Sequence, residues 1–331
     1  MPTDATRLLT LRPEGLYCPE GGFFIDPSRR VERALITHGH SDHARPGHGA
    51  VLASRQTLDI MALRYGKGFA GSMQAAEGPV RIGGVEVRFH PAGHVLGSCQ
   101  IEIRAQGVNA VVSGDYARVT NPACAAFEPV PCDLFVTEAT FALPVFQHPP
   151  PGVEIARLLA SVAAFPERTH LIGAYALGKA QRLIMLLREA GYDAPIFIHE
   201  SMQELCDYHK AQGVALGDLR LAGAGADRRG GVAIVPPTVF STPFMQRFDD
   251  PVIGFASGWM QVRKRARQGG EMPLVISDHV DWPDLTRTIR ELDPAEFWIT
   301  HGREDALMRW ATLEQRRARP LHLAGRDEEA E

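Results

Sequence analysis

Three histidines and one aspartate crowd into a short stretch of the chain, residues 37–43 (THGHSDH). Imidazole is the commonest metal ligand in proteins, and a carboxylate beside it suits zinc or manganese. Gly39 allows a sharp backbone turn, so that alternate side chains can converge on one point. An inert, solvated polar loop is the alternative. Four ligands at this spacing favour the metal site.

Three more candidate ligands follow in chain order. His94 lies in 91–98 (PAGHVLGS), Asp115 closes 113–115 (SGD), and His301 lies in 300–302 (THG). Each is weak evidence alone, since a lone histidine after a strand is more often a hydrogen-bonded loop residue than a ligand. The motifs in this order, each after an expected strand, predict a metal centre at strand ends.

The elements that must position these residues are short strands and helices. Apolar or alternating runs predict strands at 31–37, 85–90, 100–104, 109–113 and 133–137. The spacing over 54–65 predicts a helix that stops at Gly66. From residue 144 the composition changes, and helices at 153–165, 179–190 and 201–212 alternate with strands at 170–174 and 195–199, which favours a parallel α/β unit. A strand at 274–277, a helix at 282–292, a strand at 296–300 and a helix from 304 to about 317 complete the pattern.

Composition limits the class of protein. The chain has 331 residues, of which 45% are hydrophobic and 22% charged, which excludes a disordered or fibrous chain. No apolar run approaches the roughly 18 residues of a membrane span, and the first residues lack the order of a signal peptide, so we expect a cytoplasmic protein with no membrane partner. The five cysteines form no CxxC pair, which argues against a disulfide framework or a zinc ribbon. A net charge of −4 argues against a protein that only coats nucleic acid, but not against an enzyme that binds nucleic acid in one groove.

The HxHxDH pattern and its later partners resemble the metallo-β-lactamase superfamily. Residues 137–141 (TEATF) and 277–282 (SDHVDW) resemble motifs of its β-CASP nuclease branch, and residues 15–27 resemble the opening of bacterial ligase-associated DNA exonucleases. The DNA cross-link repair nucleases are more distant relatives. The resemblance covers nearly the whole chain. It implies an α/β fold, with a metallo-β-lactamase αββα sandwich from 1–145 and 256–331, an inserted compact β-CASP-like cap from 146–255, and the active site in the cleft between them.

The resemblance also implies two divalent metal ions, zinc or manganese. His38, His40 and His94 would hold one ion. Asp42, His43 and His301 would hold the other, and Asp115 would bridge both. Two such ions activate a water and stabilise the attacking and leaving oxygens of a phosphodiester.

Glu138 and His279 are expected, with Asp42 and Asp115, to be the catalytic residues. By the resemblance, Glu138 hydrogen-bonds His279, which donates a proton to the leaving oxygen. The alternatives are a surface carboxylate at 138 and a structural histidine beside Asp278.

The expected cap has its own signals. Lys179, in 172–181 (IGAYALGKAQ), lies at a strand-to-helix turn where it would bind phosphate, unless it is merely solvated. Just after the expected cap, where the chain returns to the first domain, Ser257 would contact a phosphate, and Trp259 is expected to pack rather than to stack. The basic residues at 263–267 either follow a phosphate backbone or form a solvated helix face.

The predicted function is a metal-dependent DNA exonuclease that hydrolyses phosphodiester bonds at single-stranded ends, 5′-to-3′, in DNA repair. An ATP-dependent DNA ligase and a helicase are the implied partners. The alternative is an RNA-processing β-CASP ribonuclease, because His301 is present as in the RNA-processing members. A small-molecule hydrolase would need neither Glu138, His279 nor the cap, and a non-catalytic DNA-binding scaffold has no need of seven ligands.

Overall fold

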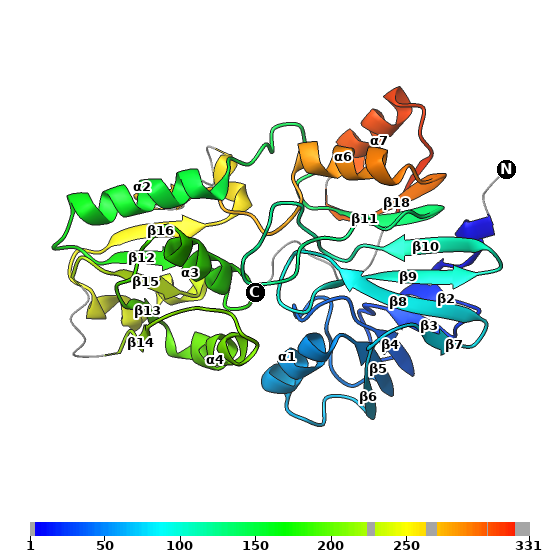
Figure 1. The fold of residues 1–331 in the computed structure, drawn as a ribbon, viewed down its shortest axis with the longest axis horizontal. Helices are drawn as coiled ribbons and strands as arrows, with labels where there is room; N and C mark the ends of the chain where they lie inside the picture. Colours follow the sequence, from blue (N-terminus) through cyan, green and yellow to red (C-terminus); the bar gives the residue numbers. More distant parts are fainter. Residues whose placement is uncertain (1–3, 224–228, 263–269, 303, 322–331) are drawn as a thin grey trace. The chain divides into compact units, whose positions relative to one another are not determined.

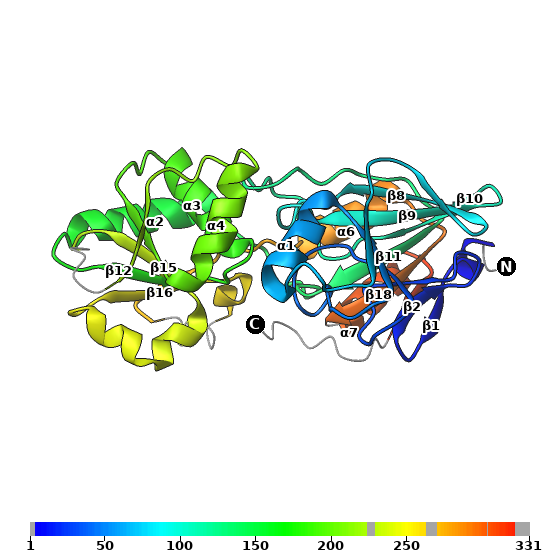
Figure 2. The same cartoon turned by 90° about the horizontal axis from the view of Figure 1, so that it is seen from below.

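The computed structural model describes residues 4–223, 229–262, 270–302 and 304–321. The chain divides into two compact units, residues 1–147 with 279–331, and residues 148–278 (Figures 1 and 2). The basic residues at 263–267 lie outside the described part. Among the described residues, no helix is both long and apolar enough to cross a membrane.

The first sheet of the first unit is built from short strands in sequence order. They are β1 (Thr10–Arg12), β2 (Gly15–Cys18), β3 (Phe23–Ile25), β4 (Arg33–Leu35), β5 (Ala50–Ala53) and β6 (Ser72–Ala75). The pairings from β3 to β6 are parallel. Helix α1 (Arg55–Tyr65) covers one face of this sheet, with Leu58 and Met61 packed against Val51 and Ala53. The 3₁₀ helix η1 (Asp4–Arg7) precedes β1.

The second sheet of this unit has the order β19-β18-β11-β10-β9-β8-β7. Its strands are β7 (Val80–Ile82), β8 (Val85–Pro91), β9 (Cys99–Ala105), β10 (Val108–Val112), β11 (Leu134–Ala139), β18 (Glu296–Gly302) and β19 (Ala318–Pro320). Strands β7 to β10 pair antiparallel, whereas β10, β11, β18 and β19 pair parallel. Helices α6 (Trp282–Leu292) and α7 (Glu304–Leu313) pack against one face of this sheet.

Side chains alternate between two cores, as the pleat of a strand requires. Val136 and Trp298 lie in the core that the second sheet shares with Leu35 and Leu52 of the first sheet. Phe135, one residue away from Val136, belongs instead to the core with α6 and α7. The layers are therefore helix, sheet, sheet and helix, and the αββα sandwich predicted from the sequence is confirmed.

The second unit is a parallel α/β unit. Its sheet has the order β14-β13-β15-β12-β16-β17, and every pairing in it is parallel among the described residues. The strands are β12 (His170–Gly173), β13 (Ile196–Ile198), β14 (Leu219–Leu221), β15 (Val232–Val235), β16 (Val252–Ala256) and β17 (Met272–Leu274). The helices are α2 (Pro151–Ala164), α3 (Lys179–Glu189) and α4 (Gln203–Ala211), with 3₁₀ helices η2 (Glu200–Met202), η3 (Pro237–Ser241), η4 (Pro243–Arg247) and η5 (Gly258–Gln261).

Two sequence expectations differ from the structure in their limits. Strand β17 pairs with β16, so the second unit extends to Asp278 and not only to residue 255. The last helix ends at Leu313 rather than near 317, because the chain turns there into β19, which pairs with β18. The assignment of residues 146–255 to a β-CASP cap stays a prediction.

Candidate metal centre and the Glu138–His279 pair

The histidine loop connects β4 to β5 in the first unit. His38 and His43 are fully buried, whereas the Asp42 side chain keeps a third of its surface exposed. Arg64, on α1, donates from Nη1 to the Gly39 carbonyl at 2.9 Å. A helix on the covered face of the first sheet therefore helps to hold the turn that brings these side chains together.

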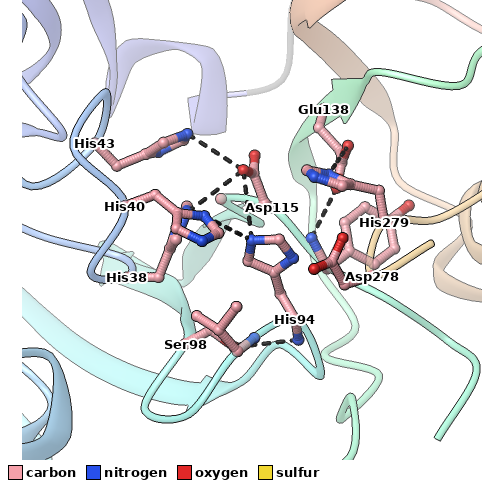
Figure 3. A network of polar contacts seen from close by, with 12 residues as sticks. His38, His40, His43, His94, Ser98, Asp115, Glu138, Asp278 and His279 are labelled. Carbon is pink, nitrogen blue, oxygen red and sulfur yellow. Dashed lines mark hydrogen bonds and ion pairs between the residues drawn. The ribbon is translucent and has the colours of Figure 1, made fainter. Parts of the chain in front are cut away.

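Four side chains point their ligand atoms at one another (Figure 3). The Nδ1 atom of His40 lies 3.1 Å from Nε2 of His38 and 3.1 Å from Nε2 of His94. Asp115 brings its Oδ2 atom to 3.4 Å from His38 Nε2 and 3.8 Å from His94 Nε2. The ligand atoms of all four lie within 4.8 Å of one another, so the group is a candidate cation site.

The chemistry of this group fits a divalent cation. Burial, reinforced by the nearby His43, holds the pKa of His38 well below 6.5. A neutral imidazole keeps the nitrogen lone pair that a metal needs. Three imidazoles with one carboxylate are the donors that zinc and manganese accept.

A second group shares the same carboxylate. His43 Nε2 lies 3.4 Å from Asp115 Oδ2 and 3.4 Å from Asp42 Oδ2. His301 lies near the end of β18, and its side chain falls outside what the structure describes. The assignment of Asp42, His43 and His301 to a second ion therefore stays a prediction.

Asp26 holds this loop from behind and was not among the predicted site residues. Its carboxylate is 2% exposed and accepts hydrogen bonds from Thr37 N at 2.8 Å and from Thr37 Oγ1 at 2.6 Å. His43 Nδ1 lies 2.8 Å from the same carboxylate. A donating Nδ1–H leaves Nε2 of His43 as the lone-pair nitrogen, on the side of Asp115. In the sequence, Asp26 was marked only by its place in residues 15–27, the stretch that resembles the opening of the ligase-associated exonucleases.

The backbones of His94 and Asp115 are fixed by their own loops. Ser98 Oγ accepts from the backbone N–H of His94 at 3.2 Å, and Asn121 Nδ2 donates to the His94 carbonyl at 2.8 Å. Gly114 has φ +57°, and a Cβ there would lie 2.7 Å from the Thr37 side chain. Only glycine therefore fits before Asp115 without strain.

The buried Glu138 and the partly exposed His279 form a pair beside this group (Figure 3). Glu138 is fully buried at the end of β11 and accepts from Tyr116 N at 2.7 Å and from Thr140 Oγ1 at 2.6 Å. His279 Nδ1 lies 2.9 Å from Glu138 Oε2, and its ring centroid lies 4.6 Å from that of His94. The hydrogen bond expected from the sequence is thus present, and a surface carboxylate at 138 is excluded.

Lys179 and Ser257 lie in the second unit. Lys179 opens α3 but is 2% exposed; its ammonium forms an ion pair with Asp278 and donates to the Ile276 carbonyl at 3.2 Å. A solvated lysine is therefore excluded, while phosphate binding by Lys179 stays a prediction. Ser257 is buried, and its Oγ accepts from Trp259 N at 3.2 Å as the cap of η5.

Sequence comparison finds relatives but no matching family model. Over 316 residues, 90% of the chain, the sequence is 27% identical to a probable DNA ligase of Opitutus terrae. It is 33% identical over 114 residues to the endoribonuclease ysh1 of Emericella nidulans, and 31% over 137 residues to the cleavage and polyadenylation specificity factor subunit 3 of Dictyostelium discoideum. These two alignments cover 33% and 38% of the chain.

The chain spans only part of each relative. The aligned region covers 30% of the ligase, 13% of the endoribonuclease and 17% of the specificity factor subunit. The structure is similar to a protein of unknown function from Enterococcus faecalis, with a TM-score of 0.59 and 12% identity over 89% of this chain and 80% of that one. That likeness concerns the fold alone.

Proposed function

Because the chain belongs to the metallo-β-lactamase/β-CASP family, we propose that it is a metal-dependent nuclease that hydrolyses phosphodiester bonds. The observation that carries the proposal is one geometry: the candidate cation group lies beside a histidine that is held by a buried glutamate. In the hydrolysis of a phosphodiester, bound cations activate the water and stabilise the phosphate charge, and a general acid protonates the leaving oxygen.

The proposed metal ligands are the residues of the two groups described above. His38, His40 and His94 would hold one ion, Asp42, His43 and His301 the other, and Asp115 both. When bound, two divalent ions, zinc or manganese, would supply an activated water and charge stabilisation at the phosphate.

We propose that the protein's own side chains protonate the leaving oxygen. Glu138 accepts from Nδ1 of His279, which fixes the ring and leaves Nε2 to carry the transferred proton. His279 keeps 12% of its side chain exposed, so its ring is reachable, whereas Glu138 is sealed. We therefore assign proton donation to His279 and positioning of its ring to Glu138.

More narrowly, we propose a DNA exonuclease that acts 5′-to-3′ on single-stranded ends in DNA repair. The support is the relative named a probable DNA ligase, which aligns with 90% of the chain. The same similarity supports a DNA ligase as a partner. That this ligase is ATP-dependent, and that a helicase is a second partner, we propose from the sequence resemblance alone. Of the two residues for which the sequence predicted a phosphate contact, Lys179 and Ser257, we keep Ser257, just after the proposed cap, as a contact of the strand; the Lys179 ammonium is paired with Asp278.

An RNA-processing ribonuclease is the second candidate. The observation that favours it is the similarity of about a third of the chain to proteins named endoribonucleases. A 2′-hydroxyl is the chemical handle by which such a site distinguishes RNA from DNA.

A time course on matched single-stranded DNA and RNA tests both candidates. Each strand carries a label at one end, zinc or manganese is supplied, and Asp115→Ala is the control. We expect mononucleotides from DNA, with the 5′ label released first, and no product from the variant. Cleavage of RNA alone would select the ribonuclease. Absence of cleavage of either strand would refute the nuclease proposal and favour a small-molecule hydrolase.

A further inference from the structure

Two buried cations of α3 hold the segment that leads into His279. Lys179 Nζ donates to the Ile276 carbonyl at 3.2 Å and forms an ion pair with the Asp278 carboxylate. Arg182, one helical turn further on, donates from Nη1 to the Ser277 carbonyl. The spacing of three places both cations on the same face of the helix. Three consecutive residues, 276–278, are thus held by two side chains.

The burial of these cations is costly and asks for a reason. Lys179 is 2% exposed and Arg182 is 1% exposed, and such residues are almost never fully buried unless they are paired. Lys179 is also the first residue of α3, where the helix dipole favours an anion. The stability of the helix therefore does not account for a lysine at this position, whereas its contacts with residues 276 and 278 do.

The held segment is followed immediately by the proposed proton donor. Asp278 is the last residue of the second unit and His279 the first of the returning first unit. One peptide bond separates the Lys179 partner Asp278 from the residue whose ring binds Glu138. Because Asp278 is bound to Lys179 and the His279 ring to Glu138, only the few torsion angles between these two contacts can still change the position of the imidazole.

We infer that Lys179 and Arg182 are positioning residues that act through 276–278 on His279. The inference rests on the proposed function, because it concerns the proton that His279 donates. It assigns Lys179 a role different from the predicted phosphate contact. A misplacement of about 1 Å in a reacting group can lower a rate about 100-fold, so this hold would matter for turnover.

The test uses two substrates that differ in their need for a proton. Hydrolysis of thymidylyl-thymidine releases an alkoxide leaving group that must be protonated. Hydrolysis of p-nitrophenyl thymidine 5′-phosphate releases a nitrophenolate, which needs no proton. General acid catalysis contributes about 100- to 10,000-fold, so His279→Ala should lose rate on the dinucleotide only. For Lys179→Met we expect a fall in kcat of about 10- to 100-fold on the dinucleotide. The nitrophenyl ester should change less than about 3-fold, because no proton is required.

Two further variants separate positioning from folding. Removing one charge of a buried pair is strongly destabilising in other proteins, so Lys179→Met/Asp278→Leu, which removes both charges, is made beside the single variant. Lys179→Arg keeps the charge and should restore most of the rate on the dinucleotide. Arg157→Met is the matched control: Arg157, on α2, donates to the Pro273 carbonyl at 2.8 Å and should leave the ratio of the two rates unchanged.

The outcomes distinguish this inference from the proposed function. Equal losses on both substrates, or a rise in KM confined to 5′-phosphorylated substrates, would overturn the positioning role. Wild-type protein that cleaves neither substrate would refute the nuclease proposal. The inference is then decided by the ¹⁵N resonances of the His279 ring: they should shift in Lys179→Met and stay in place in Arg157→Met, and unchanged resonances in both would overturn it.

Discussion

Replacement of Asp26 by asparagine should weaken the metal centre without touching a metal ligand. Asp26 accepts from Thr37 N, from Thr37 Oγ1 and, at 2.8 Å, from His43 Nδ1. Asparagine keeps the size of the side chain and one carbonyl oxygen, which can still accept from Thr37 N. Its amide group would then face the His43 ring, where two donors oppose each other.

The Thr37 hydroxyl, which shares Oδ2 with His43, can turn and accept from the new amide, so the magnitude follows from the lost bond to His43. A hydrogen bond to a charged group contributes about 1.5–3 kcal/mol, and each 1.4 kcal/mol corresponds to a factor of about ten. Turning His43 so that it no longer presents Nε2 to Asp115 should therefore lower the affinity for the second ion about 10- to 100-fold, as for other residues that orient a metal-bound histidine.

Competition with a fluorescent zinc chelator measures this affinity, and elemental analysis gives the number of ions retained. Asp133→Asn is the matched control, because Asp133 also accepts from a backbone N–H, that of Asn109 at 2.9 Å, but in the second sheet. Thermal unfolding of both variants shows whether the fold is kept. An Asp26→Asn protein that is folded and retains two ions with wild-type affinity would refute the reasoning.

Three other changes have expected outcomes. Asp115→Ala should lose both ions and all nuclease activity, because its carboxylate serves both groups; elemental analysis that still finds two ions contradicts this. Gly114→Ala puts an alanine in a left-handed conformation against Thr37, which should cost about 1–2 kcal/mol of unfolding free energy and lower the unfolding midpoint in calorimetry by about 2–8 °C. Gly78→Ala, which has open space around it, should leave the midpoint unchanged. Burial lowers the pKa of His209 below 6.5, so the unfolded chain binds one more proton and the free energy of unfolding falls as the pH drops below 6.5. Urea titrations at pH 7.5 and 5.5 measure this fall, which should be smaller in His209→Met. The same fall in the variant as in the wild type would contradict the prediction.

The histidine loop of the candidate cation group could be predicted from the sequence, because its signal is local. The histidine loop places four candidate ligands, three histidines and one aspartate, within six residues. Glu138 and His279 were predictable through the motifs around them, although they lie 141 positions apart. In each case a short run of residues carries the signal by itself.

The supporting contacts were not readable, because they join distant residues. Asp26 contacts His43 across 17 positions, and its place in residues 15–27 does not indicate which residue it contacts. Lys179 meets Asp278 across 99 positions, so the sequence showed a strand-to-helix turn but not the partner that buries the lysine. Strand β3 escaped prediction for another reason: three residues are too few to show an alternation.

The state of Glu138 links the architecture to the chemistry. A carboxylate with no exposed surface, in a strand of mostly apolar residues, is tolerated only when donors surround it. Two of its donors, Tyr116 N and Thr140 Oγ1, come from nearby loops and would satisfy a structural role. The third is the ring of His279, which lies against the ring of His94. A purely structural glutamate has no need of that third donor, whereas a proton donor beside a cation group needs an anchored ring, and this argues that β11 buries Glu138 for the sake of His279.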